Sequence, residues 1–94
     1  MNIKSFLVSY DLGGPESSSD YRALIDKIKS YHWCKPLESL WLITVEGEDC
    51  SDIRDELKNY LDSNDKLLII DVTGSDWATR NINSKVTDWM KHNL

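Results

Sequence analysis

The chain has 94 residues, 40% of them hydrophobic and 29% charged, a balance typical of one folded domain and not of a disordered chain. Its longest strictly apolar runs are four residues and its start lacks a signal-peptide pattern, so we expect a single domain over residues 1–94, cytoplasmic and without a membrane partner. The net charge is −5, and residues 46–76 alone carry −7, from ten acidic and three basic residues. This acidic segment argues against broad binding to duplex nucleic acid but allows a local basic face or an acidic metal site.

The first half of the chain predicts a strand, a helix and two strands. Residues 3–10 are apolar on both faces, as in a central strand that is covered on both sides, and residues 11–15 (DLGGP) end it. The serines of residues 17–19 offer caps for a helix. Residues 32–36 are short and irregular and residues 37–45 are strand-like, so together they predict a short strand that turns into a long one. The helix between has an amphipathic stripe of Tyr21, Leu24, Ile25, Ile28 and Tyr31.

The second half predicts a helix, a strand and a terminal helix. Asp49 or Ser51 caps the first of these helices, which has apolar side chains on its inner side. Residues 67–72 (LLIIDV) predict a strand that is apolar on both faces. Asn83 or Ser84 caps the last helix. The inner stripes are Ile53, Leu57, Tyr60 and Leu61 in the first helix and Val86, Trp89 and Met90 in the last.

The order β-α-β-β-α-β with an extra C-terminal helix predicts a ferredoxin-like α+β sandwich, in which two helices cover one face of a four-stranded antiparallel sheet. In this topology the fourth strand lies at the sheet edge, and residues 67–72 are too apolar for a bare edge. We therefore expect the terminal helix, the tail or a second subunit to cover them. Cys34 and Cys50 lack metal-binding or redox spacing and are predicted to be separate, buried or half-buried thiols.

Asp11 is the leading candidate for chemistry, as a catalytic residue and metal ligand. It follows the first strand directly, where a carboxylate is rigidly aimed and can bind Mg²⁺ or orient water. The alternative is that Asp11 starts a turn by accepting hydrogen bonds from backbone N–H groups two residues further on. One carboxylate holds Mg²⁺ poorly, so the metal hypothesis needs a two-fold dimer that brings two copies together.

The four tryptophans divide into two groups. Trp41 alternates with leucines in a strand and Trp89 lies on a helix stripe, so both are predicted to be core residues. Trp33 and Trp77 lie outside regular apolar patterns and are the candidates for an exposed or interface role, including base stacking. Ser9, Ser39 and His32 show no spacing that links them into a nucleophile and base.

Several segments resemble known bacterial families. Over nearly its whole length the chain is similar to small bacterial proteins labelled SinR-like, a label that carries a presumed regulatory role. The similar segments are FLVSYDL, LIDKIKSY, LESLWLI, IRDELKNYLDSNDKLLI and GSDWA with the later TDWMK. The first third more distantly resembles the small CRISPR-associated endoribonucleases that form the dimeric scaffold of the spacer integrase, and the VapD-like toxin nucleases. The matching motif is Tyr10-Asp11-Leu12, followed by a helix and then LESLWLI.

The second resemblance implies a ferredoxin-like dimer in which the aspartates of two subunits, here Asp11, share one Mg²⁺. Ser39 falls near the hydroxyl–aromatic segment of those families, and Tyr10 ends the first strand as theirs does. Those families carry a run of arginines that grips nucleic acid, and the basic side chains of this chain in that region are Arg22, Lys27 and Lys29.

Two functions follow from these patterns. The first is a homodimer, related to the CRISPR-associated endoribonucleases and VapD-type nucleases, that binds nucleic acid or cleaves it weakly with a metal ion. The alternative is a non-catalytic regulatory or interaction module, such as an antitoxin-like or phage-defence accessory protein with a protein partner. The end of the first strand at Asp11 favours the first, and the acidic charge balance favours the second.

Overall fold

Four strands and three α-helices follow one another in the predicted order. The computed structural model describes residues 2–13 and 18–94. A mixed α+β domain with a four-stranded antiparallel sheet is thereby confirmed. The elements are β1 (Ile3–Asp11), α1 (Ser18–Lys29), β2 (His32–Leu37), β3 (Leu40–Glu46), α2 (Cys50–Leu57) with a 3₁₀ turn (Lys58–Tyr60), β4 (Lys66–Asp71) and α3 (Ser84–Asn93).

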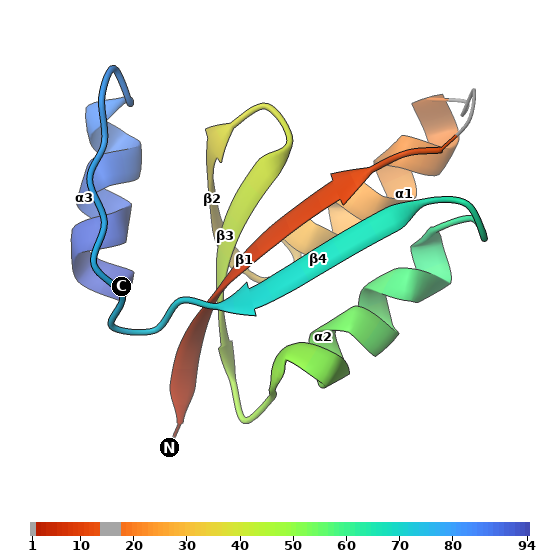
Figure 1. The fold of residues 1–94 in the computed structure, drawn as a ribbon, viewed down its shortest axis with the longest axis horizontal. Helices are drawn as coiled ribbons and strands as arrows, with labels where there is room; N and C mark the ends of the chain where they lie inside the picture. The colour runs from red at the N-terminus through yellow and green to blue at the C-terminus, as the bar shows by residue number, and fades with distance from the viewer. Residues whose placement is uncertain (1, 14–17) are drawn as a thin grey trace.

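The sheet has the strand order β2-β3-β1-β4, and each neighbouring pair is antiparallel. The predicted central position of β1 is therefore confirmed: its Phe6 lies opposite Ile43 of β3 on one side and Asp71 of β4 on the other. Helices α1 and α2 lie on one face of the sheet, whereas α3 lies apart from them, beside β2 (Figure 1). One face of the sheet is therefore covered by α1 and α2, and α3 is not part of that layer.

The main core lies between the sheet and the helices α1 and α2. Its side chains are almost inaccessible to solvent, and burying each large apolar one contributes about 1.5–3 kcal/mol to folding. They come from alternate positions of the strands and from the inner stripes of the helices, as the sequence pattern predicts. They are Phe6, Val8, Leu24, Ile28, Trp41, Ile43, Ile53 and Leu57.

A second, smaller cluster joins α3 to the opposite face of the sheet. Met90 of α3 packs with Cys34 of β2 and Leu42 of β3, and all three are buried. Trp89 stacks on His32 with ring centroids 5.2 Å apart. The buried hydroxyl of Ser5 donates a hydrogen bond to the backbone carbonyl of Asn93. The prediction that the Trp89–Met90 stripe packs onto the sheet is confirmed.

The prediction of one long strand over residues 37–45 is wrong. Glu38 and Ser39 form a turn, Leu37 ends β2, and β3 begins at Leu40. The predicted short strand at residues 32–36 is β2, and its pairing with β3 shifts register between Cys34 and Leu37. Pro36 is tolerated inside β2 because this strand lies at the sheet edge, where one side of the backbone has no neighbouring strand.

The apolar strand β4 forms the other edge of the sheet. Leu67 and Ile69 point to the main core, but Leu68 and Ile70 are on the opposite face and are 55% and 44% exposed. The terminal helix lies over β2 instead, at the far side of the sheet. Within the described residues of one chain, this part of β4 is therefore open, and the expectation that the terminal helix or tail covers it is not met.

In residues 2–13 and 18–94, none of the helices combines the length and the apolar character that crossing a bilayer requires.

Candidate functional site

Asp11 is the last residue of β1, and its side chain is exposed. The alternation of the strand puts Asp11 on the same face as Leu7 and Ser9, away from α1 and α2. It lies opposite Lys66, the first residue of β4, and together with Ser9 and Leu68 these residues line a shallow hollow of ≈ 200 Å³. The position is that of a carboxylate at a strand end, as predicted.

The loop after Asp11 is held by the turn at residues 62–65. The Gly13 backbone N–H donates to Asp65 Oδ1 at 2.9 Å, and a Cβ atom on Gly13 would collide with the Asn64 carbonyl, so glycine is required by this close approach. The N–H two residues after Asp11 is thus bonded to Asp65. The rest of the loop that would test Asp11 as a turn residue lies outside the described residues.

Tyr10 and Ser39 have structural partners near Asp11. The Tyr10 hydroxyl accepts a hydrogen bond from the Trp41 indole N–H at 3.3 Å, and the Tyr10 ring packs against the main core. The Ser9 hydroxyl donates to the backbone carbonyl of Ser39 at 3.0 Å, which ties the end of β1 to the turn between β2 and β3. The structure therefore brings Tyr10, Ser39 and Asp11 to one end of the sheet, on its two faces.

The metal hypothesis rests on the Asp11 carboxylate of each chain. Mg²⁺ prefers several oxygen ligands, and Asp11 supplies one carboxylate, with the ammonium-bearing Lys66 opposite it on β4. Among the described residues, no three His, Cys, Asp or Glu side chains gather closely enough to hold a metal ion. A Mg²⁺ site at Asp11 therefore needs oxygen ligands from water, nucleic acid or a second copy of the chain.

The three predicted basic residues do not act together. Lys29 Nζ lies 5.2 Å from the centroid of the Trp33 ring, at the β2 edge of the sheet. Lys27, two positions earlier on α1 and hence on a different side of the helix, lies 5.1 Å from the centroid of the Tyr31 ring instead. Arg22 is exposed on α1, seven residues or about two turns before Lys29. Of the three, only Lys29 contacts a candidate aromatic residue among the described contacts.

Lys29, Trp33, Lys35 and Trp41 form one cluster, which we name the lysine–tryptophan surface. The rings of Trp33 and Trp41 meet edge to face with centroids 5.2 Å apart, and Lys35 Nζ lies 5.0 Å from the Trp41 ring centroid. Trp41 is 1% exposed and Trp33 is 37% exposed. The predicted division into a core Trp41 and an exposed Trp33 is thus confirmed.

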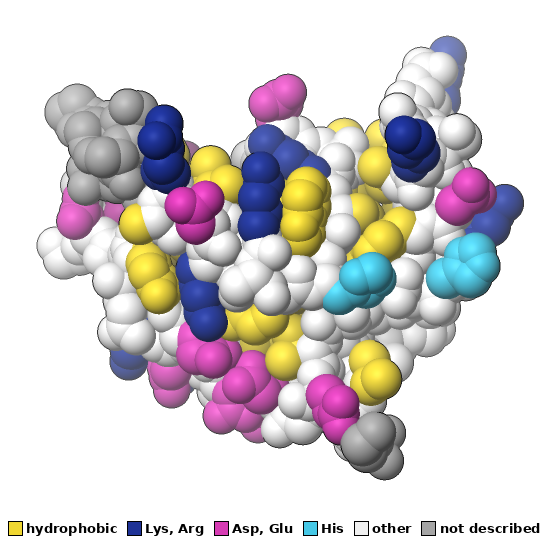
Figure 2. Space-filling view, turned by 180° about the vertical axis from the view of Figure 1, so that it is seen from behind, with side chains coloured by type: hydrophobic (Ala, Val, Ile, Leu, Met, Phe, Trp, Pro, Cys, Tyr) yellow, Lys and Arg dark blue, Asp and Glu magenta, His cyan; other side chains and the backbone are white. Residues whose placement is uncertain are grey.

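Figure 2 shows one face of the molecule, seen from behind the view of Figure 1. Lys and Arg side chains lie beside a hydrophobic side chain near the middle of the face, while Asp and Glu side chains gather toward its lower edge. Lys35 is not among the residues predicted from the sequence, because residues 32–36 have no regular apolar pattern. The available signal was the i, i+2 spacing of Trp33 and Lys35, which places both on one face of a strand.

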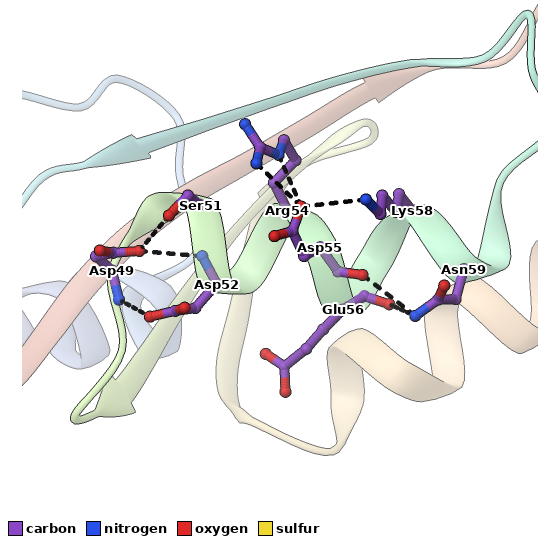
Figure 3. Close-up of polar contacts among 8 residues, drawn as sticks. All are labelled: Asp49, Ser51, Asp52, Arg54, Asp55, Glu56, Lys58 and Asn59. Atoms are coloured by element: carbon purple, nitrogen blue, oxygen red, sulfur yellow. Dashed lines mark hydrogen bonds and ion pairs between the residues drawn. The ribbon is translucent and has the colours of Figure 1, made fainter.

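The acidic residues that begin α2 serve the helix itself (Figure 3). Asp49 accepts from the backbone N–H of Asp52 at 3.0 Å, and the Asp52 carboxylate accepts from the backbone N–H of Asp49, which is a complete capping box. Asp55 pairs with Arg54 at 3.0 Å and with Lys58 at 3.4 Å. Three of the ten acidic residues in residues 46–76 are therefore used to cap and pair in and around α2.

Trp77 lies on the other side of the molecule from Trp33 and is half-buried. It lines an open hollow of ≈ 380 Å³ between the sheet, the segment after β4 and α3. Most of the lining is apolar, and Asp76 and Arg80 supply charges. The apolar side chains that line it include Leu7, Leu37, Leu40, Leu42, Val72 and Met90.

No family model matches this chain. Among solved structures, the chain is similar to a hypothetical protein, TT1823, from Thermus thermophilus, with a TM-score of 0.66. The two share 20% sequence identity over 87% of this chain and 96% of that one. At this level of identity the likeness shows a shared fold.

Proposed function

We propose that this protein is a cytoplasmic, ferredoxin-like domain that binds nucleic acid as a homodimer and is related to the CRISPR-associated endoribonucleases and VapD-like nucleases. The strand order β2-β3-β1-β4, with both helices of the β-α-β units on one face, supports the ferredoxin-like assignment. The resemblance at Tyr10-Asp11-Leu12 supports the relation to these nucleases.

The observation that carries nucleic-acid binding is the lysine–tryptophan surface. Two ammonium groups, those of Lys29 and Lys35, lie 5.2 and 5.0 Å from the centroids of two touching indole rings. Lysine neutralises phosphate, and aromatic rings stack on bases, so this combination suits a nucleic-acid strand. The net charge of −5 limits binding to such a local surface and favours modest affinity.

Binding is tested by fluorescence anisotropy with labelled RNA and DNA oligonucleotides at low salt. The double variant Lys29→Gln/Lys35→Gln should bind several-fold more weakly than the wild type. Lys85→Gln/Lys91→Gln, which removes the same charge from exposed positions of α3, is the matched control and should bind as the wild type does. Equal losses in both variants would show a general charge effect and would contradict a dedicated surface.

Asp11 carries the catalytic part of the proposal. In a dimer that brings two Asp11 side chains together, like charges repel, and Mg²⁺ or Mn²⁺ would relieve the repulsion and act as a Lewis acid beside a phosphate. Either metal should then raise the melting temperature, and Asp11→Asn should abolish both this increase and any cleavage of RNA or DNA. Asp26→Asn, at an exposed position of α1, is the control and should change neither. A metal response that survives in Asp11→Asn would rule out this site.

The second candidate function is a non-catalytic regulatory or interaction module, in keeping with the SinR-like resemblance. A separate observation favours it: the apolar hollow beside Trp77 and the exposed Leu68 and Ile70 lie on the face of the sheet away from α1 and α2. Exposed apolar surface of this kind marks protein contacts. This function predicts unchanged melting temperature with metal, and no binding to oligonucleotides.

A further inference from the structure

We infer that the lysine–tryptophan surface is a base-stacking site for single-stranded nucleic acid, with Trp33 as the stacking residue and Lys29 and Lys35 as phosphate contacts. This inference rests on the proposed nucleic-acid binding and adds the strand state and the contact residues. The site is distinct from Asp11, which lies at the end of β1 on the opposite face of the sheet.

Trp33 is an exposed ring on a fixed support. Its ring meets Trp41 edge to face, and Trp41 is itself 1% exposed and bonded through its indole N–H to the Tyr10 hydroxyl at 3.3 Å. The backbone of Trp33 is held in β2, opposite Ile43 of β3. A side chain that is anchored in this way loses little further freedom when a base stacks on it, which favours binding.

Lys29 and Lys35 lie where their ammonium groups can contact the phosphates of a bound strand. Lys29 Nζ lies over the Trp33 ring in the structure, and a cation–aromatic contact at an exposed site is weaker than base stacking. Because a lysine side chain is long and flexible, its ammonium can move from the ring to a phosphate when a base arrives. Lys35, over the adjacent Trp41 ring, supplies a second positive charge beside the same platform.

The surface selects single strands over duplexes. A stacking platform needs a base whose face is free, and the bases of a duplex are stacked on one another. Duplex binding without stacking needs many basic contacts along the backbone, and this acidic chain places two lysines at the platform. The site is therefore expected to hold one or two unpaired nucleotides.

The test compares four probes of equal length on the wild-type protein: single-stranded RNA, single-stranded DNA, duplex DNA, and an abasic phosphodiester strand. Both single strands should bind, and the duplex and abasic probes should bind at least about fivefold more weakly, the loss expected for one missing base stack. The logarithm of the association constant should fall with the logarithm of salt with a slope of about −1.4, the value for two phosphate contacts to a single strand. RNA and DNA are distinguished by their relative affinities.

Variants at Trp33 complete the test. Trp33→Ala should weaken single-strand binding by about fivefold or more, whereas Trp33→Phe, which keeps a stacking ring, should retain most of it. Melting curves of both variants separate loss of stacking from loss of folding. If Trp33→Ala binds as the wild type does, or if the abasic probe binds equally well, the stacking site is wrong although nucleic-acid binding stands. If no probe binds the wild type, both proposals fail.

Discussion

Tyr31, which follows α1, contacts Glu56 of α2 on the covered face of the sheet, and Glu48 lies just before α2. The Tyr31 hydroxyl donates to Glu56 Oε2 at 3.0 Å, and burial together with this bond raises the pKa of Tyr31, which keeps the phenol protonated. Burial, and then the neighbouring Glu56 carboxyl, also raise the pKa of Glu48 above its ordinary value, whereas the charge of Lys27 opposes the shift.

The raised pKa of Glu48 predicts a particular pH dependence of stability. The folded chain binds this proton more tightly than the unfolded chain does, so the free energy of unfolding falls as the pH rises from the unfolded pKa to the folded pKa, and is flat above it. Glu48→Gln mimics the protonated form, and it should raise the melting temperature at neutral pH and reduce this slope. Melting curves from pH 4 to 8 measure both quantities.

Glu46→Gln is the matched control for this experiment. Glu46 ends β3 and is exposed, so its removal changes the net charge by the same amount without touching the pair. It should leave the slope as in the wild type. A slope that is identical in Glu48→Gln and the wild type would contradict a protonated Glu48.

Among the secondary-structure elements, α3 is the one whose attachment depends on few residues. Met90 is its buried side chain, and Trp89 and the Asn93 carbonyl add the stack on His32 and the hydrogen bond from Ser5. The helix is capped by Asn83, whose side chain accepts from the Lys85 N–H at 2.8 Å. The main core, by contrast, draws on both other helices and several strands.

Met90→Ala should therefore loosen α3 selectively. Removing a buried methionine side chain lowers the free energy of unfolding by about 2–5 kcal/mol. We expect about 2 kcal/mol here, because this cluster is open on one side. For a domain of this size that loss lowers the melting temperature by roughly 10 °C. The tryptophan fluorescence should change at a lower temperature than the far-ultraviolet circular dichroism, since Trp89 separates from His32 first. Lys91→Ala, at an exposed position of α3, should change neither; an unchanged melting temperature in Met90→Ala would show that α3 is not held by this contact.

The sequence predicted the order of elements because each has a strong local pattern, such as the run of β1 that is apolar on both faces and the inner stripe Ile53–Leu57 of α2. It failed where the result depends on pairing between distant segments. The edge position of β4 was predicted from the topology, but the expected cover of its apolar side chains by the terminal helix or tail is not met, because α3 packs beside β2 instead. The contact of Lys35 with the Trp41 ring likewise depends on the register of β2 against β3, which local patterns do not contain.

At the scale of the whole molecule, the two faces of the sheet differ in character. The face of α1 and α2 has a closed core and, at its β2 edge, the lysine–tryptophan surface. The other face holds α3, the apolar hollow beside it and the open part of β4. A nucleic-acid strand at Trp33 and a protein contact at β4 would therefore occupy different sides and need not compete.

The open edge predicts how two copies of the chain would associate. If two β4 strands pair antiparallel about Ile69, Leu68 of each copy lies opposite Ile70 of the other, on the same face, and the exposed apolar side chains cover one another. Each Asp11 is level with Lys66, three residues from this centre, so the two Asp11 side chains would be about 20 Å apart along the strands. Such a dimer cannot share one metal ion between them.

Two variants therefore distinguish two kinds of homodimer, by light scattering over a concentration series with and without Mg²⁺. In the dimer paired through β4, Ile70→Lys should give monomers, because it puts an unpaired ammonium from each copy into the interface between the two β4 strands. Asp11→Asn and removal of Mg²⁺ should leave this dimer intact. In the dimer with a shared metal, the dependence is reversed: Asp11→Asn or chelation dissociates the dimer, and Ile70→Lys does not. A wild type that stays monomeric at high micromolar concentration would exclude both, and would leave Leu68 and Ile70 as a surface for a different protein.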